Sequence, residues 1–325
     1  MAHFLITGGA GFIGSHLAER LLGAGHSVTV MDNCSTGRQA NIAHLRDHPK
    51  FRLCIESIEN AAVLDRLVSE CDAIFHLAAA VGVKLIVERP AEVIETNVVG
   101  TASVLNVARR YKRGVFIAST SEIYGKSERI PFKEDDDRLL GPTTKSRWCY
   151  SDSKAVDEFL GLAYHKEHGL KVVIGRFLNT IGPRQTGHYG MVVPRFVQAA
   201  LAGRPIEVYG DGKQSRCFLD VDEAVDADIK LMEHERAGGE VFNIGSIREI
   251  TITALAEKII ALTKSASTIT RIPYDQACEP GFEDMRRRVP DLSKLKQWIG
   301  MEPNIPLDQT LQRIIAYHGV AGRGA

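Results

Sequence analysis

The strongest constraint on the fold of this chain is a regular alternation between short apolar runs and amphipathic stretches through its first half. The apolar runs are uninterrupted, and the stretches between them carry apolar residues at helical spacing. This pattern is typical of a parallel sheet that is covered by helices on both faces. The predicted strands are residues 3–7, 27–32, 51–56, 73–78, 114–119 and 171–177. We therefore expect an α/β fold with a doubly wound parallel sheet.

After about residue 178 the pattern changes to glycine, proline and short mixed segments, such as NTIGPRQTGHYG and RIPYDQACEPG. This change predicts a smaller, mixed α/β lobe beside the sheet. We predict a first domain over residues 1–177, a second lobe over 178–318 and a frayed tail over 319–325. Segments after about residue 205 are candidates to return to the first domain.

The composition argues against several classes of function. Lys+Arg and Asp+Glu are balanced at 40 each, so no basic excess points to nucleic acid or to an anionic membrane. The first residues, MAHFLITGG, lead straight into a predicted strand, so we expect no signal peptide, and no apolar window is long enough to span a membrane. The six cysteines form no CxxC pair and have no histidine at zinc spacing. We expect reduced thiols, no metal and a cytoplasmic protein.

The stretch ITGGAGFIGSHLAERL places Gly8, Gly11 and Gly14 between the first strand and the first helix. Glycine there allows a tight turn, close approach of the backbone to a pyrophosphate and close packing of the helix on the strand. The helix N-terminus then offers free N–H groups to the anion. Asp32 ends the next strand, 18 residues after Gly14, where a carboxylate accepts both ribose hydroxyls of an adenosine and disfavours a 2′-phosphate. These residues predict a Rossmann-type domain that binds NAD rather than NADP.

A tyrosine and a lysine stand four residues apart in RWCYSDSKAVDEFL, which places Tyr150 and Lys154 on one face of a helix. A free tyrosine has a pKa near 10 and is a poor base at neutral pH. A nearby ammonium and the positive nicotinamide ring are expected to lower that pKa, which makes Tyr150 a usable acid and base for a hydroxyl proton. Lys154 is also placed to hold the nicotinamide ribose. Ser119, Thr120 and Ser121, at the end of another strand, can hydrogen-bond the same substrate oxygen.

Five motifs occur in a characteristic order: TGGAGFIG, HLAA, STSEIYG, YSDSK and RFLNTIGPR. Together they resemble the extended branch of the short-chain dehydrogenase/reductase superfamily, and in particular its enzymes that act on nucleotide sugars. The resemblance extends to about Tyr317. It implies an NAD cofactor and a temporary oxidation, in which NAD takes hydride from C4 of a sugar while Tyr150 takes the O4 proton. The cofactor-binding residues that it implies are Gly8, Gly11, Phe12, Ile13, Gly14, Asp32, Ile58, Leu77, Ala78, Ala79, Asn97, Tyr150 and Lys154.

The resemblance also implies a UDP-sugar substrate, bound by the lobe over residues 178–318. Two phosphates need cations, and arginine binds phosphate oxygens with a planar fork. By resemblance, Asn179 and Arg216 hold the diphosphate, and the stretch around Tyr209 frames the uracil. Arg184 is a further candidate for the substrate site.

Three reactions are open once C4 is a ketone. An epimerase returns hydride to the other face of the sugar. A 4,6-dehydratase removes the C5 proton and expels the C6 hydroxyl. A decarboxylase loses CO₂ from a C6 carboxylate that is now β to the ketone.

The residues around Glu122 favour the third reaction. Dehydratases of this family carry Asp-Glu where this chain has Ser121-Glu122, and simple 4-epimerases place a small or hydroxyl residue at the Glu122 position. The sequence TSE, the Arg-Trp pair before Tyr150 and the stretch GFEDMRRRVPD, which contains Arg288, resemble UDP-glucuronate decarboxylases. Arg288 would then hold the substrate carboxylate or protonate C5, and Glu122 would crowd that carboxylate with like charge until CO₂ leaves.

We therefore predict NAD-dependent decarboxylation of UDP-glucuronate, with 4-epimerisation of UDP-glucuronate or UDP-glucose as the alternative. A 4,6-dehydratase, a plain ketoreductase and a non-catalytic NAD-sensing protein are weaker alternatives. The predicted catalytic residues are Tyr150, Lys154, Thr120, Ser121, Glu122 and Arg288.

The resemblance further implies a homodimer, because extended short-chain enzymes commonly pair through the helix that bears the tyrosine and lysine. Val156, Phe159 and Ala163 lie at roughly helical spacing on that predicted helix. Packing within one chain explains the same spacing equally well.

Overall fold

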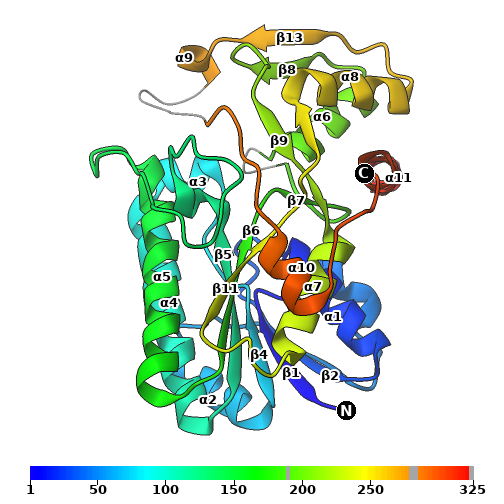
Figure 1. The fold of residues 1–325 in the computed structure, drawn as a ribbon. Helices are drawn as coiled ribbons and strands as arrows, with labels where there is room; N and C mark the ends of the chain where they lie inside the picture. Colours follow the sequence, from blue (N-terminus) through cyan, green and yellow to red (C-terminus); the bar gives the residue numbers. More distant parts are fainter. Residues whose placement is uncertain (188–190, 278–284, 322–325) are drawn as a thin grey trace.

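The computed structural model describes residues 1–187, 191–277 and 285–321. It has two parts, a large sheet with helices on both faces and a smaller lobe beyond one end of that sheet (Figure 1). None of the helices in these ranges is long and apolar enough to cross a membrane.

The large part is built on a seven-stranded sheet in which every paired strand is parallel, in the order β11-β6-β5-β4-β1-β2-β3. Its strands are β1 (His3–Thr7), β2 (Ser27–Met31), β3 (Phe51–Cys54), β4 (Ala73–His76), β5 (Gly114–Thr120), β6 (Val172–Phe177) and β11 (Glu240–Ile244). Six of them occupy the runs predicted from the sequence. The doubly wound α/β fold is thereby confirmed.

Helices cover both faces of this sheet (Figure 1). One face packs against α1 (Phe12–Gly23), α7 (Val221–Glu233) and α10 (Ser293–Ile299). The other packs against α2 (Ala61–Glu70), α4 (Pro90–Tyr111) and α5 (Arg147–His168). The short elements of this part are η1 (Gln39–Leu45), α3 (Val83–Glu88) and η2 (Ser121–Tyr124).

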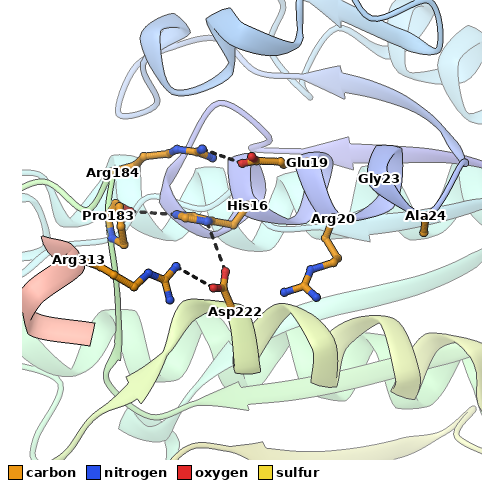
Figure 2. Close-up of a pocket in the computed structure, with 9 residues that line it drawn as sticks. All are labelled: His16, Glu19, Arg20, Gly23, Ala24, Pro183, Arg184, Asp222 and Arg313. Carbon is orange, nitrogen blue, oxygen red and sulfur yellow. Dashed lines mark hydrogen bonds and ion pairs between the residues drawn. The ribbon is translucent and has the colours of Figure 1, made fainter. Parts of the chain in front are cut away.

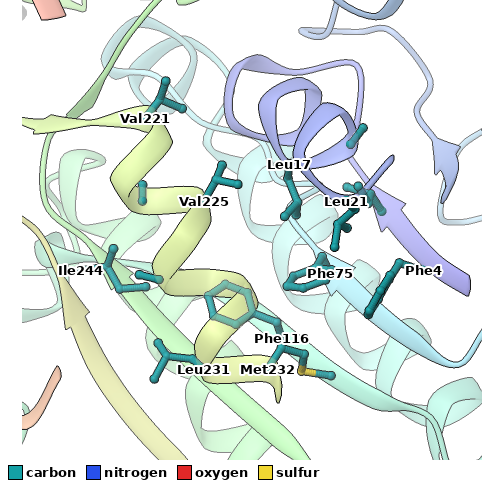
Figure 3. Close-up of a cluster of buried hydrophobic side chains, with 14 of the residues drawn as sticks. Phe4, Leu17, Leu21, Phe75, Phe116, Val221, Val225, Leu231, Met232 and Ile244 are labelled. Carbon is teal, nitrogen blue, oxygen red and sulfur yellow. The ribbon is translucent and has the colours of Figure 1, made fainter. Parts of the chain in front are cut away.

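Each face has its own apolar core. On the α1 side, Leu17 and Val225 point toward the sheet around Phe75, and all three are at most 1% exposed (Figure 3). Full burial of such a side chain contributes roughly 1.5–3 kcal/mol. These contacts hold α1 and α7 on the sheet, so the start of α1 is fixed relative to the strand ends.

Local signals set several helix ends. The side chain of Asn60 accepts a hydrogen bond from Val63 N and caps the start of α2. The backbone of Gly169 adopts φ +64° and ends α5, a conformation that glycine takes without a Cβ penalty. Pro90 stands in the first turn of α4, where no N–H is needed.

The smaller lobe has a core of its own. It contains α6 (Val192–Leu201), β8 (Ile206–Tyr209), α8 (Ile252–Thr263), β13 (Ile269–Ile272), α9 (Tyr274–Ala277) and α11 (Leu307–Ala321). Short pairs link it to the large part: parallel β7 (Thr180–Ile181) with β10 (Leu219–Asp220), and antiparallel β9 (Ser215–Cys217) with β12 (Glu249–Thr251).

The chain crosses between the two parts more than once. After the first pass through the lobe, α7 and β11 return to the large part, and β11 pairs with β6. The α10 helix packs on the same core near β11. These three elements lie within residues 178–318, which the sequence assigns to the second lobe. The sequence prediction also allowed segments after about residue 205 to return to the first domain.

Candidate active site

The site is built at the carboxyl ends of the central strands. Strand order reverses between β1 and β4, which are neighbours in the sheet although β2 and β3 lie between them in the sequence. In open α/β sheets the crevice at such a reversal is where ligands bind. Many of the predicted functional residues of the first domain follow β1, β2, β4 and β5, so they gather along this edge.

The glycine-rich loop connects β1 to α1 with no room for side chains. Gly8 has φ +73°, and a Cβ on it would lie 2.7 Å from the backbone nitrogen of Ala78. A Cβ on Gly14 would lie 2.5 Å from the carbonyl oxygen of Gly8. The α1 helix begins at Phe12, and Gly11 offers no side-chain cap to its first N–H groups. Such a helix start, with the backbone open to close approach, fits a pyrophosphate.

Asp32 lies at the end of β2 beside this loop. Its carboxylate is 7% exposed and accepts hydrogen bonds from Ala10 N at 2.9 Å and Cys34 N at 2.7 Å. Burial raises the pKa of Asp32, while the two backbone N–H groups act in the opposite direction. Each carboxylate oxygen accepts more than one hydrogen bond, so the group retains capacity for ribose hydroxyls. The loop and Asp32 together fit an adenine dinucleotide.

The other residues predicted for the cofactor site line the same edge. Phe12 and Ile13 form the first turn of α1, and Ile58 packs beneath α4 against Gly100. Leu77, Ala78 and Ala79 follow β4 next to Gly8.

Asn97 has a different kind of environment. It is fully buried, and its side chain bonds the backbone of Ala80 and the hydroxyl of Ser153. It therefore ties the loop after β4 to α5, one residue before Lys154.

Tyr150 and Lys154 lie one turn apart on α5, as their spacing predicts. Tyr150 is 9% exposed, and the Thr120 side chain at the end of β5 hydrogen-bonds its phenol. Lys154 is 2% exposed, and its Nζ lies 2.6 Å from Oδ2 of Asp157. Burial, and then the charge of Glu122, raise the pKa of Tyr150. This differs from the lowering that the Tyr–Lys spacing predicts, because burial disfavours the phenolate and the charges of Glu122 and Asp157 act in the same direction.

The hydroxyl residues at the end of β5 have separate roles. Ser119 donates to Oε1 of Glu158 at 2.5 Å, and Glu158 also forms an ion pair with Arg176 at 2.7 Å. Thr120 caps η2 by accepting from Glu122 N at 3.2 Å. Of the three, Thr120 is the one that bonds Tyr150, and the adjacent Ser121 is 2% exposed.

Glu122 lies between two arginines that are far apart in the sequence. Its Oε1 is 3.2 Å from Nη2 of Arg288 and 3.5 Å from Nη2 of Arg147. Both arginine side chains are only 9% exposed, and the side chain of Glu122 is 16% exposed. Two buried guanidinium groups thus meet the carboxylate of Glu122 beside Tyr150. Arg147 was not among the predicted site residues, although it belongs to the Arg-Trp pair that resembles the decarboxylases.

Arg288 reaches the cluster through a backbone pairing. Phe132 N donates to Val289 O at 2.8 Å, and Asp291 N donates to Phe132 O at 2.7 Å. Phe132 is itself fully buried and stacks on Tyr124 with ring centroids 4.6 Å apart. The segment that carries Arg288 is thus fixed against the chain that follows Glu122.

The three consecutive arginines have different environments. The side chains of Arg286 and Arg287 are 77% and 55% exposed and pair with Asp211 and Glu249. Arg288 alone of the three is buried. The first part of the stretch GFEDMRRRVPD, residues 281–284, lies outside the described residues.

The predicted substrate residues of the second lobe each make a separate contact within the protein. Asn179 has φ +46° and donates to Cys217 O at 3.1 Å. Arg216 is 8% exposed and donates to Ser215 O at 2.7 Å. The ring of Tyr209 lies under the guanidinium of Arg195, 4.0 Å from its carbon.

Arg184 lies elsewhere, on the outer side of α1. It pairs with Glu19 at 2.7 Å in a pocket of about 640 Å³ between α1 and α7 (Figure 2). The residues that line this pocket include none of those around Tyr150 or Glu122. Within residues 1–187, 191–277 and 285–321, no group of three or more His, Cys, Asp or Glu side chains could hold a metal ion.

The fold and the site define a class of protein: a Rossmann-type chain with a glycine-rich loop, an acidic end to its second strand and a Tyr–Lys pair on a helix beside the fifth strand. Comparison with known proteins agrees with this class. A family model described as GDP-mannose 4,6 dehydratase matches residues 5–314. The chain belongs to this nucleotide-sugar epimerase/dehydratase family of the short-chain dehydrogenases/reductases, and it is an enzyme of that family.

Individual relatives cover nearly the whole chain. The UDP-N-acetyl-alpha-D-glucosaminuronate decarboxylase of Bacillus cytotoxicus is 45% identical over 96% of both chains. UDP-glucuronic acid decarboxylase 1 of Danio rerio is 38% identical over 96% of this chain and 72% of its own length. The crystal structure of UDP-glucuronic acid 4-epimerase from Bacillus cereus, in complex with UDP-glucuronic acid and NAD, superposes with a TM-score of 0.87 at 26% identity, over 97% of this chain and 98% of that chain.

Proposed function

We propose that this enzyme is an NAD-dependent decarboxylase of a UDP-hexuronate. The observation that carries the proposal is the buried cluster of Glu122, Arg147 and Arg288 beside Tyr150. Two largely buried guanidinium groups side by side suit a substrate that brings a carboxylate of its own. The decarboxylases among the relatives support the same reading.

The chain's own groups account for the first step. NAD, held by the glycine loop and Asp32, supplies the hydride acceptor for C4 of the sugar. Tyr150 removes the O4 proton as the hydride leaves, and the hydroxyl of Thr120 keeps the phenol oriented. The ammonium of Lys154 favours the phenolate and has N–H groups to offer the nicotinamide ribose.

The arginine cluster accounts for the second step. Arg147 and Arg288 hold the C6 carboxylate of the sugar, and Glu122 places a like charge next to it. The C5–C6 bond then breaks, its electron pair passes to C5 and the C4 carbonyl oxygen, and CO₂ leaves. Tyr150, now protonated, stabilises the developing negative charge on O4. A proton delivered to C5 completes the 4-keto pentose product.

The substrate carries either a hydroxyl or an acetamido group at C2. The sequence favours UDP-glucuronate, which is the substrate in the name of the Danio rerio relative. The relative from Bacillus cytotoxicus is named for the N-acetylated uronate. Both belong to the proposed class, and the chemistry at C4 to C6 is the same for both.

The alternative is 4-epimerisation of a UDP-hexuronate. The Bacillus cereus neighbour is an epimerase in complex with UDP-glucuronic acid, and a carboxylate-binding arginine is equally compatible with it. The two reactions differ in whether carbon is lost. UDP-glucuronate and UDP-N-acetylglucosaminuronate, each incubated with enzyme and NAD, are expected to give CO₂ and a UDP-pentose or its 4-keto form by mass spectrometry. A product with the mass of the substrate would establish the epimerase.

Arg288 can be tested against a matched neighbour. Arg288→Leu is expected to lower kcat/KM for decarboxylation by about 10²-fold or more, since a buried charge-assisted contact is lost. Arg287→Leu, which removes an exposed arginine one residue away, is expected to leave it within about twofold. Equal effects of the two variants would contradict the assignment of the carboxylate to Arg288.

We also propose a homodimer through α4 and α5. Large apolar side chains are exposed on these two packed helices: Ile94, Val99, Val156 and Phe159. Phe159 is 65% exposed, which is unusual for a side chain with no partner surface. Light scattering is expected to give a dimer mass for the native chain and a monomer mass for Phe159→Asp. The five described cysteines are all unpaired thiols, which supports a reducing compartment such as the cytoplasm.

A further inference from the structure

A fully buried carboxylate lies directly behind the catalytic lysine. Asp157 is three residues after Lys154 on α5, so both project from the same face of the helix. Its Oδ2 is 2.6 Å from Nζ, and the side chains are 0% and 3% exposed. The proposed reaction needs only the ammonium. The carboxylate at this position therefore calls for a separate explanation.

A column of hydrogen bonds supports the carboxylate from beneath. Thr7 is the last residue of β1, and its hydroxyl oxygen lies 2.7 Å from Nδ1 of His76. Nε2 of His76 lies 3.0 Å from the hydroxyl of Thr101 on α4, and that hydroxyl faces the carboxylate of Asp157. We call these residues, with Lys154, the polar column. It runs from the strand that enters the glycine loop to the catalytic lysine.

The hydrogen bonds of the polar column can all be donated in one direction, from Thr7 toward Asp157. Burial lowers the pKa of His76 to about 3, with a smaller effect from Lys154, so the imidazole is neutral and has one N–H. If Thr101 donates to Asp157, its oxygen must accept from Nε2–H of His76, and Nδ1 then accepts from Thr7. Every donor points toward the carboxylate. Burial raises the pKa of Asp157, and the ammonium of Lys154 and the hydroxyl of Thr101 act in the opposite direction.

Several charged groups face Tyr150 from the elements around α5. Glu122 comes from η2, where Arg147 of α5 and Arg288 of the segment after residue 285 already pair with it. Lys154 and Asp157 come from α5 itself.

The remaining described neighbours add little net charge. Glu158 is neutralised by Arg176 of β6 at 2.7 Å. His76 of β4 is neutral. The residues of α4 in this region, Asn97 and Thr101, do not titrate. Glu122 and Asp157 both act on the phenol of Tyr150, and Asp157 is the carboxylate that contacts Lys154.

We propose that Asp157 is a positioning residue that fixes the ammonium of Lys154 and, through its charge, contributes to the pH at which Tyr150 ionises. This inference rests on the proposed acid–base role of Tyr150. One N–H of the ammonium is directed to Asp157, which leaves two for the nicotinamide ribose. The carboxylate also offsets the charge of the ammonium as felt by the phenol. The proton on Tyr150 is thus held more tightly than a lone Lys154 would allow.

A direct titration of the phenol tests the proposal without turnover. The ultraviolet absorbance of the phenolate is followed across the neutral and alkaline pH range with NAD present. Each variant is also made with the additional substitution Tyr150→Phe, and the titration of that protein is subtracted to isolate the signal of Tyr150. Asp157→Asn keeps the shape and removes the charge, and it is expected to lower the midpoint for Tyr150 by about 1 pH unit. An unchanged or higher midpoint would overturn the proposal.

Two further variants separate charge from packing. Thr101→Val interrupts the polar column but keeps the carboxylate, so the midpoint is expected to stay close to that of the native chain. A shift as large as that of Asp157→Asn would assign the effect to packing and would overturn the proposal. Asp157→Ala removes the charge by another route and replaces Asp157→Asn in the titration if that variant fails to fold.

The pH profile of turnover distinguishes this inference from the proposed function. With an active substrate, the acid limb of kcat/KM is expected to move to lower pH in Asp157→Asn in step with the titration midpoint. If the midpoint shifts while no UDP-hexuronate is turned over, the proposed function fails and the coupling between Asp157 and Tyr150 stands. If substrate is turned over and neither midpoint nor acid limb shifts, this inference alone fails.

Discussion

Two aspartates are fully buried on opposite faces of the sheet, and their partners differ. Asp157 on α5 faces an ammonium at 2.6 Å and a threonine hydroxyl. Asp228 on α7 is 0% exposed, and neither of its carboxylate oxygens has a hydrogen-bond partner in the described part of the chain. Burial raises the pKa of Asp228 well above its ordinary value. Burial raises the pKa of both carboxyl groups, and of the two only Asp157 has a cation and a hydroxyl that act against this effect.

The largest expected effect comes from removing the lysine of the buried Lys154–Asp157 ion pair. Lys154→Met leaves the charge of Asp157 buried without a partner, and we expect a loss of about 3–5 kcal/mol in the free energy of unfolding, together with loss of turnover. Urea denaturation measures the first and product analysis the second. The double variant Lys154→Met/Asp157→Leu should recover much of the stability and none of the activity. A single variant as stable as the native chain would show that the pair contributes nothing to the fold.

Replacement of Asp228 should increase the free energy of unfolding rather than decrease it. Asp228→Leu removes an unsatisfied polar group from an apolar surrounding, so the free energy of unfolding is expected to increase by about 1–3 kcal/mol at neutral pH. Asp228→Asn, which keeps polar atoms in the same place, serves as the matched control and should gain less. A destabilised leucine variant would mean that the carboxylate has a structural partner after all.

The pH dependence of stability sharpens the same contrast. The pKa of Asp228 is higher in the folded state than its ordinary value of 3.8. The stability that its protonation contributes is therefore fully present below pH 3.8, and it is lost as the pH rises through the pKa of the folded state. The difference in unfolding free energy between Asp228→Leu and the native chain should therefore grow from acid toward neutral pH. Denaturation curves at a series of pH values measure this difference. A constant difference would contradict the raised pKa.

The smallest expected effect concerns an ion pair near the surface. Glu19 is about half exposed, so Arg184→Ala is expected to cost less than about 1 kcal/mol of stability. The same variant tests the predicted substrate role of Arg184. An unchanged KM would place this arginine outside the substrate site, and a KM that rises severalfold would retain it there.

Prediction from sequence succeeded best where function depends on neighbours in the chain. The glycine loop follows its strand directly, and Tyr150 and Lys154 share one helical turn, so spacing alone places them. The six apolar runs of the first half were long enough to identify as strands. The seventh strand, β11, was missed because EVFNI is interrupted by polar residues and lies in a region of short mixed segments. Its place in the sheet depends on pairing with β6, some 65 residues earlier in the chain.

The residues that we propose to distinguish one reaction from another were harder to find. Arg288 was reached through a family resemblance, and Arg147 was visible only as part of an Arg-Trp pair. Asp157 had no signal beyond its distance of three residues from Lys154. Nothing in the sequence showed that Arg288 would be buried while Arg286 and Arg287 are exposed.

The sequence by itself determined the α/β class, the cofactor loop and the Tyr–Lys pair, because each depends on periodicity or on contacts within a few residues. Only the tertiary structure decided which charges meet: Glu122 with Arg288 across 166 positions, and Asp157 with a column that begins at Thr7. The physical reason is that charge interactions depend on distance and burial, and both are set by how the sheet and its helices pack rather than by order along the chain.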